Sequence, residues 1–148
     1  MNTLPTFRAP TTVERIFNRT FGFFVGLGLA PSHIFLLEVR GRKSGKIYRT
    51  PVDLLEFQGK QYLVAPRGRT QWVQNAEAAG EIVLKQGSQR RRYRLRAIAL
   101  PDRPPFLKAY LDRFKTEVQR YFSIRAGSPV QAFSAVAESY PVFELIAA

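Results

Sequence analysis

The chain contains no cysteine and a single histidine, His33, among its 148 residues. Without cysteine, disulfides, thiolate metal sites and cysteine nucleophiles are excluded. A zinc site would have to combine His33 with carboxylates alone, and a Ser-His-Asp triad would have to use this one imidazole. Because His33 follows a Pro-Ser pair and precedes an apolar run, we interpret it as a turn residue and predict no metal site.

Acidic residues are also few. Eleven Asp and Glu stand against 23 Lys and Arg, which gives a net charge of +12 and a pI near 10.7. This charge predicts an anionic partner, which could be nucleic acid, a lipid surface, or a phosphorylated cofactor or substrate. With 45% hydrophobic residues, the chain is expected to fold as one domain over residues 1–148.

Long hydrophobic runs are missing as well. The longest, residues 21–30, is about half of the roughly twenty residues that cross a bilayer. We interpret residues 1–31 as an N-terminal arm with a helix that begins near Thr12. A cytoplasmic protein is expected, and peripheral contact of this arm with a membrane stays open as an alternative.

Alternation of apolar and polar residues predicts about five mostly antiparallel strands, and a final strand in "YPVFELI" after the helices. Pro51 falls within one of them, and it must lie at an edge or a bulge because it cannot donate to a ladder. Thr70 is expected to cap a short helix that ends at Gly80. A longer helix is expected from residue 104 and a short one over residues 128–137. This order predicts an α+β protein, a small barrel with helices at its edges.

The run "GRKSGKIYRTPV", residues 41–52, is the strongest candidate for a binding element. Two glycines free the backbone, so that successive N–H groups can converge on one anion. A serine hydroxyl adds a donor, and four cationic side chains add charge. By composition alone, such a turn is more often a solvated surface.

Together with the later "YLVAPRGRTQWVQNAEAAG" and the closing "YPVFEL", this run resembles the deazaflavin-dependent nitroreductase family, within the split β-barrel flavin and deazaflavin oxidoreductases. The resemblance covers residues 34–145. It implies a split β-barrel of mostly antiparallel strands with peripheral helices. It also implies an oxidoreductase that moves a hydride from reduced coenzyme F-420, or from FMN as the second choice, to a quinone, enone or nitro compound.

The resemblance further implies where the cofactor is held. The basic turn and the strand after it would hold the anionic tail and line the groove, through Arg42, Lys43, Ser44, Gly45, Arg49, Thr50 and Pro51. Ala65 and Pro66 would border the ring, and Trp72 and Asn75 would fix its wall. Trp72 is equally interpretable as a core anchor of its helix.

One loop departs from the family pattern: "PRGRT" is short and carries Arg67 and Arg69. These arginines either add phosphate contacts or fill the space of the ring. Tyr110 and Tyr121 are candidates near the substrate by position only. No catalytic residue is assigned, and the final proton could come from a tyrosine, a serine or water.

Two other interpretations stay open. Nucleic-acid binding is suggested by the arginine stripe of residues 90–96, although most aromatic residues fall at core-periodic positions. Alternatively, the chain is a cofactor-free family member that binds a partner or a membrane. In the stripe, Arg92, Arg94 and Arg96 are expected on one side of a strand and Tyr93 on the other. A homodimer through this strand is a further hypothesis.

Overall fold

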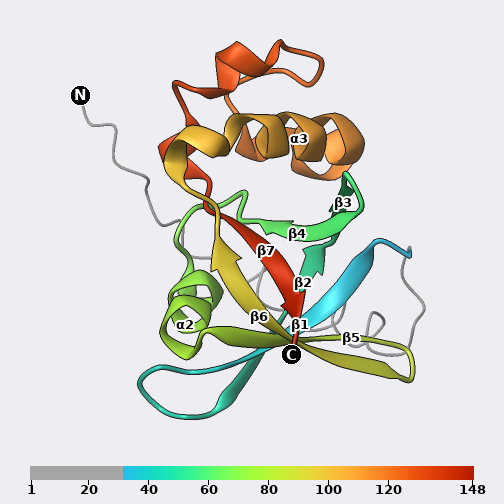
Figure 1. Cartoon of the computed structure of the whole chain (residues 1–148), viewed down its shortest axis with the longest axis vertical. Helices are drawn as coiled ribbons and strands as arrows, with labels where there is room; N and C mark the ends of the chain where they lie inside the picture. The colour runs from blue at the N-terminus through green and yellow to red at the C-terminus, as the bar shows by residue number, and fades with distance from the viewer. Residues whose placement is uncertain (1–31) are drawn as a thin grey trace.

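A computed structural model of the chain describes residues 32–148, so the predicted helix of the arm lies outside the described residues. Seven antiparallel strands form one sheet in the order β2-β1-β5-β6-β7-β4-β3. They are β1 (Ile34–Arg40), β2 (Ile47–Asp53), β3 (Leu55–Phe57), β4 (Lys60–Val64), β5 (Glu81–Gln86), β6 (Gln89–Ala97) and β7 (Val142–Ala147). The sheet curls strongly on itself (Figure 1). The predicted α+β class is confirmed, and the final strand expected in the C-terminal segment is β7.

Two α-helices flank this sheet, α2 (Gln71–Ala79) and α3 (Pro104–Val118). Figure 1 shows α3 and the C-terminal segment after it over β3 and β4, and α2 beside β5. Thr70 is the N-cap of α2, and Gly80 ends the helix in the left-handed region at φ 76°. Both predicted ends of α2 are therefore confirmed.

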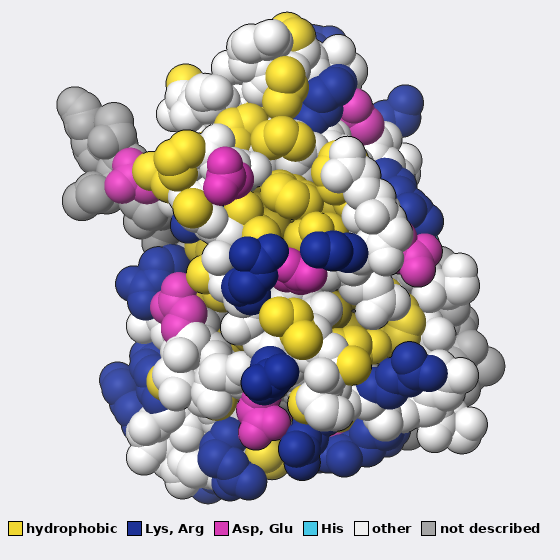
Figure 2. Space-filling view, in the orientation of Figure 1, with side chains coloured by type: hydrophobic (Ala, Val, Ile, Leu, Met, Phe, Trp, Pro, Cys, Tyr) yellow, Lys and Arg dark blue, Asp and Glu magenta, His cyan; other side chains and the backbone are white. Residues whose placement is uncertain are grey.

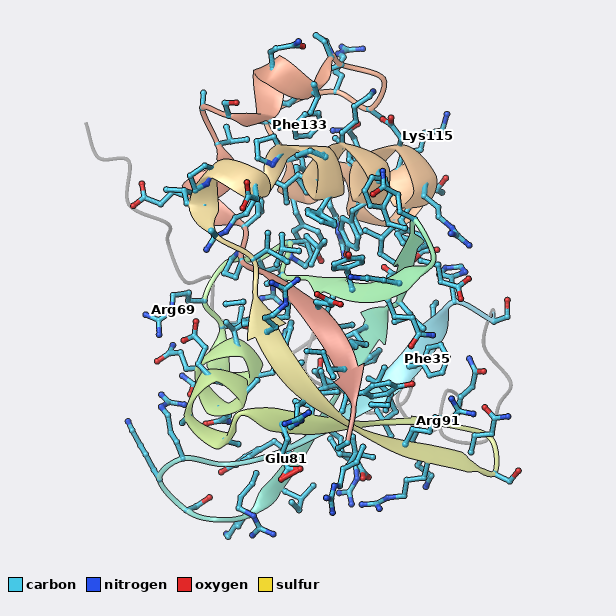
Figure 3. All side chains as sticks on the ribbon, viewed as in Figure 1. Phe35, Arg69, Glu81, Arg91, Lys115 and Phe133 are labelled. Atoms are coloured by element: carbon cyan, nitrogen blue, oxygen red, sulfur yellow. The ribbon has the colours of Figure 1, made fainter. Side chains whose placement is uncertain are left out.

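The helix predicted over residues 128–137 is wrong. The segment instead forms two separate 3-10 turns, Val130–Phe133 and Ala137–Ser139. Its N–H groups bond three residues back, as from Val136 to the Phe133 carbonyl at 3.2 Å. This tighter winding seats the fully buried Phe133 against α3 (Figure 3), and a short 3-10 piece suffices where packing supplies the stability.

Two hydrophobic clusters lie on opposite sides of the sheet. One lies under α3 and contains Tyr110, Leu111 and Phe133. The other lies inside the curve and contains Leu37 and Ala76. Each fully buried large side chain of these clusters contributes about 1.5–3 kcal/mol to stability. The strands between them hold α2 and the β1–β2 turn in place.

The strand faces follow the predicted alternation. β2 is an edge strand of the sheet, so Pro51 occupies the edge position that its missing N–H requires. In β6, Arg92, Arg94 and Arg96 are exposed and Tyr93 is buried. The predicted orientation of the arginine stripe is confirmed.

His33 is a turn residue, as predicted, and it has contacts that the sequence does not suggest. Its Nε2 lies 2.9 Å from Oε1 of Glu117 in α3 and 3.4 Å from Oδ1 of Asp53 in β2. Burial raises the pKa of Asp53 to about 8, and the neighbouring Glu117 adds to this rise. The cluster joins α3 to the β1–β2 hairpin.

Within residues 32–148, no helix combines the length and the apolar character needed to cross a membrane.

Candidate functional site

The basic turn between β1 and β2 is closed by its own backbone. The Gly41 N–H donates to the Lys46 carbonyl at 2.7 Å, and the Gly45 N–H donates to the Gly41 carbonyl at 3.0 Å. Gly45 has φ +75°, which a residue with a side chain adopts only with strain. At Gly41, an added Cβ would lie 2.5 Å from the Tyr48 ring. The two glycines thus serve a defined turn rather than general flexibility.

Arg42 fastens this turn to α2. The Arg42 backbone N–H donates to Asn75 Oδ1 at 3.0 Å, and its Nη1 donates to the same oxygen at 2.7 Å. Further bonds run from Nη1 to Gln71 Oε1 at 3.0 Å and from Nη2 to Gln74 Oε1 at 3.1 Å. Arg42, expected at the cofactor tail, and Asn75, expected at the wall beside the ring, are directly bonded. The guanidinium therefore positions the turn.

Gln71 and Gln74 were not predicted as site residues, although their spacing in the sequence indicates that they act together. Together with Asn75 they occupy positions i, i+3 and i+4 of α2, which share one face of a helix. Three amide side chains on one face supply three acceptors for one guanidinium. Asn75 is 5% exposed, so its bonds to Arg42 are the shielded part of this contact.

Two lysines carry the free charge of the turn. Lys43 and Lys46 are exposed, and neither forms an ion pair within the part of the chain that the structure describes. The Ser44 hydroxyl accepts the Lys46 backbone N–H at 3.2 Å and lies 3.2 Å from the Tyr48 hydroxyl. The turn therefore offers two ammonium groups and one hydroxyl to solvent.

Arg49 follows the turn in β2, and its side chain faces the opposite side of the hairpin from that of Thr50. Its Nε donates to Glu38 Oε2 at 2.7 Å, and the second oxygen of Glu38 accepts Arg90 Nη2 at 3.3 Å. Burial alone would raise the pKa of Glu38, but the bonds and charges of Arg49 and Arg90 hold it below its usual value. Arg49 is thus already ion-paired, by an acid that the sequence analysis did not single out.

Thr50 and Pro51 are placed by the β1–β2 register. Thr50 pairs with the fully buried Leu37, and Pro51 pairs with Leu36. Directly paired residues share a face of the sheet and successive residues alternate. Thr50 therefore faces the same side as Leu37, and Pro51 faces the opposite side with Arg49.

The loop from β4 to α2 forms the neighbouring wall. Ala65 is 1% exposed, and its N–H donates to the Pro141 carbonyl at 2.9 Å. Pro66 is half-buried beside it. At the end of the loop, the Arg69 guanidinium donates to Glu77 in α2 at 2.6 Å. Arg69 therefore braces the loop on α2.

The first turn of α2 lacks electrostatic compensation. It contains no acidic residue, and the N-cap side chain of Thr70 makes no capping hydrogen bond. The Thr70 hydroxyl oxygen is buried and has no hydrogen-bond partner among residues 32–148. Free N–H groups and the positive end of the helix dipole favour an anion at such a terminus.

Trp72 packs as a core anchor. Its ring centroid lies 6.3 Å from that of Phe143. The half-buried indole contacts the cluster inside the curve of the sheet and a smaller cluster of Ala65, Val73 and Phe143. This arrangement supports the structural interpretation of Trp72. Among the predicted residues, Arg42 is thus bonded to Asn75, and Trp72 packs in one cluster with Ala65, whereas Arg49 and Pro51 lie on the opposite side of the hairpin from Thr50.

Two open grooves on the described residues lie elsewhere. One of about 630 Å³ is lined by the β3–β4 turn and by parts of β6 and β7, including Arg91, Tyr93 and Glu144. The other, of about 430 Å³, is lined by residues just after the C-terminal end of α3, including Arg120 and Arg125. Neither contains a predicted cofactor residue.

Comparisons with known proteins agree with this fold. The sequence profile of the F420H(2)-dependent quinone reductase family matches residues 10–126. No curated protein matches the chain. Among solved structures, an F420-H2 dependent reductase is 21% identical with a TM-score of 0.51, covering 77% of this chain and 94% of the other.

Two further structures show the same architecture. A protein described as a domain-swapped dimer is 22% identical with a TM-score of 0.54, covering 90% of this chain and 92% of the other. A NimC/NimA family protein from Clostridium acetobutylicum is 14% identical with a TM-score of 0.53, covering 86% and 77%. These likenesses show the fold alone, and they confirm the predicted split β-barrel.

Proposed function

Because this chain belongs to the F420H(2)-dependent quinone reductase family, we propose that it is a reductase that uses reduced coenzyme F-420. Its acceptor is a quinone or a related electrophile such as an enone or a nitro compound. The bound deazaflavin supplies the hydride, and the protein holds and orients it and excludes water. FMN is the second candidate for the cofactor.

The basic turn beside the uncompensated start of α2 is the observation that carries this proposal. Arg42 holds the turn against Gln71, the first residue of the helix. Lys43 and Lys46, the unpartnered Thr70 hydroxyl and the free N–H groups of α2 suit the phosphate and carboxylates of a deazaflavin tail. In this proposal the lysines and Ser44 bind the tail, whereas Arg42 and Asn75 position the turn.

The rest of the predicted site has supporting roles. Gly45 gives the turn its shape, and Thr50 borders the tail on the inner face of β2. Pro66 borders the ring, the buried Ala65 supports the loop beneath it, and Trp72 stiffens the wall behind them. Arg49 and Pro51 lie on the opposite face of the hairpin, where they support β2 through Glu38 and the edge of the sheet.

The arginine stripe gives weaker support to nucleic-acid binding. Figure 2 shows Lys and Arg side chains over the lower part of the molecule, where acidic side chains lie among them. Arg90, Arg92 and Arg96 each pair with a glutamate. Phosphate binding would have to compete with these pairs, and aromatic side chains that could stack on bases are mostly buried. The predicted homodimer stays a prediction.

The test is titration of the purified chain with F-420, FMN and FAD, followed by cofactor fluorescence. Replacing Lys43 and Lys46 together by Ala should weaken F-420 binding at least tenfold, because each charge-assisted bond contributes about 1.5–3 kcal/mol before solvent screening. The matched control is Lys115→Ala with Arg125→Ala, which removes the same charge far from the turn; Lys115 lies on α3 (Figure 3).

Three outcomes decide the proposal. A selective loss in the first double variant, with F-420-dependent reduction of a soluble quinone in the wild type, supports it. An equal loss in both double variants would mean that net charge alone attracts the cofactor. Absence of binding by any of the three cofactors, together with flotation on anionic liposomes, would favour the membrane-associated alternative.

A further inference from the structure

Three metal-ligating side chains from three separate elements meet at one end of the sheet. His33 lies in the turn before β1, Asp53 is the last residue of β2, and Glu117 lies in the final turn of α3. The imidazole Nε2 is 2.9 Å from Glu117 Oε1 and 3.4 Å from Asp53 Oδ1. The three ligand atoms all lie within 4.8 Å of one another.

This spacing is close to that of a zinc coordination shell. Zinc binds imidazole nitrogen and carboxylate oxygen at about 2.0–2.2 Å, and tetrahedral geometry then separates neighbouring ligand atoms by about 3.4 Å. The nitrogen of His33 and the oxygen of Asp53 already lie at that separation. The Glu117 oxygen, at 2.9 Å, would have to lie about 0.5 Å farther from the nitrogen, and its side chain is the most exposed of the three at 39%.

Two carboxylate groups share one imidazole nitrogen in this cluster. The Nε2 atom carries at most one hydrogen, and that hydrogen can point along only one good hydrogen bond. Two carboxylate oxygens nevertheless converge on the same nitrogen, and only the Glu117 contact has hydrogen-bond geometry. The Asp53 side chain is 12% exposed, so water compensates it only partly. A divalent cation between the three atoms would satisfy both carboxylates at once.

The protein holds the three ligands in fixed positions. Leu54 N–H donates to the His33 carbonyl at 2.8 Å, and Ile34 pairs with Asp53 across the β1–β2 ladder. The His33 ring stacks on Phe114 with centroids 4.9 Å apart and 25° between planes. Phe114 precedes Glu117 by three residues and lies at a kink in α3, with φ −111° and ψ 26°. Packing on Phe114 therefore orients the imidazole, whereas the exposed Glu117 side chain can adjust to a bound ion.

We propose that His33, Asp53 and Glu117 form a binding site for a divalent transition metal such as Zn²⁺, which ties the end of α3 to the β1–β2 hairpin. One imidazole and two carboxylates are a ligand set that zinc accepts, whereas Mg²⁺ and Ca²⁺ prefer oxygen ligands throughout. The partly exposed Glu117 side leaves room for water as a fourth ligand. The site does not depend on the proposed cofactor.

The single histidine makes the test direct. The untagged full-length chain is freed of metal with a chelator, then titrated with Zn²⁺ by calorimetry and with Co²⁺ by visible absorption. Long-range ¹H–¹⁵N NMR follows the one imidazole in the protein. We expect saturable binding of one metal ion per chain, a Co²⁺ absorption band, and a shift of the His33 Nε2 resonance that saturates with the calorimetric signal.

Variants separate this site from adventitious surface binding. Asp53→Asn and Glu117→Gln should each weaken Zn²⁺ binding at least tenfold, whereas Asp102→Asn, at an exposed acid with no ion pair among the described residues, should leave it unchanged. If Asp53→Asn does not fold, Glu117→Gln at the more exposed position carries the test. No saturable binding, binding without movement of the His33 resonance, or full binding by His33→Gln would each overturn the proposal.

Discussion

Replacing Asn75 by Ala should cost stability out of proportion to the size of the change. Asn75 Oδ1 accepts two bonds from Arg42, one from its backbone N–H and one from its guanidinium. A neutral bond contributes about 1 kcal/mol and a bond to a charged group about 1.5–3 kcal/mol. Ala regains up to about 0.7 kcal/mol through its higher helix propensity. Since Arg42 is partly exposed, the lower end applies, and the net loss is about 2 kcal/mol.

Urea unfolding followed by the fluorescence of Trp72 measures this loss. Trp72 is the only tryptophan of the chain and lies in α2, three residues before Asn75, so it reports on the affected helix. For a domain of this size, 1 kcal/mol shifts the melting temperature by about 3 °C, and thermal unfolding should therefore show a decrease of about 6 °C. Asn75→Asp keeps an acceptor and adds an attractive charge, so it should lose less.

Gln71→Ala is the matched control. Gln71 is exposed and offers Arg42 one bond, at 3.0 Å, so its removal should cost less than about 1 kcal/mol. If Asn75→Ala loses no more stability than Gln71→Ala, the buried amide does not fasten the turn. Arg42 would then have no structural role that distinguishes it from the lysines beside it.

Two further predictions concern the turn and the opposite side of the sheet. Gly45→Ala should destabilise the protein by about 1–2 kcal/mol, because φ is +75° there and an added side chain adopts this conformation only with strain. No atom blocks the added Cβ, so this strain is the whole effect, and Gly45→Asn should cost less. Equal stability of the wild type and Gly45→Ala would contradict the backbone geometry. The hydrogen bond and charge of Arg96, together with Lys60, lower the pKa of Glu144 in the folded protein. The ionised Glu144 therefore stabilises the fold fully above the unfolded pKa of about 4.5, and this stabilisation is lost as pH falls through the lower folded pKa. Glu144→Gln should therefore be less stable than wild type at neutral pH and converge with it in acid, and a constant difference in thermal unfolding across that pH range would contradict the ion pair.

Local features of the fold could be predicted because their causes are local. The left-handed conformations of Gly45 and Gly80 and the edge position of Pro51 each follow from the conformational limits of one residue type. The alternation of Tyr93 with its neighbouring arginines is likewise readable from the pattern along one strand.

The pairing of distant strands could not be predicted in the same way. β6 pairs with β7 across residues 98–141, which form helices and turns, and many registers would bury a similar number of apolar side chains. The segment before β7 shows the same limit. Its composition suggests a helix, but the packing of Phe133 on α3 favours two 3-10 turns. Tertiary contacts outweigh propensity in such short segments.

Counting charges in the sequence identifies the basic turn as a candidate binding region, but it does not distinguish the roles of the individual cations. Arg42, Lys43, Lys46 and Arg49 look equivalent in sequence, yet acceptors elsewhere in the fold distinguish them. Asn75 lies on a helix 33 residues from Arg42. Glu38 is the cross-strand partner of Arg49 in the β1–β2 register. Which cations remain free depends on these distant partners.

This division separates two effects that a single variant would confuse. Arg42→Ala should lower both the melting temperature and the affinity for an anionic cofactor, because the turn loses its attachment to α2. Lys43→Ala should lower the affinity alone, because the structure records no bond of its side chain to the described residues. If both losses occur in Lys43→Ala, the lysine also helps to hold the turn. If Arg42→Ala loses affinity at unchanged stability, its guanidinium leaves the amides of α2 and binds the cofactor directly.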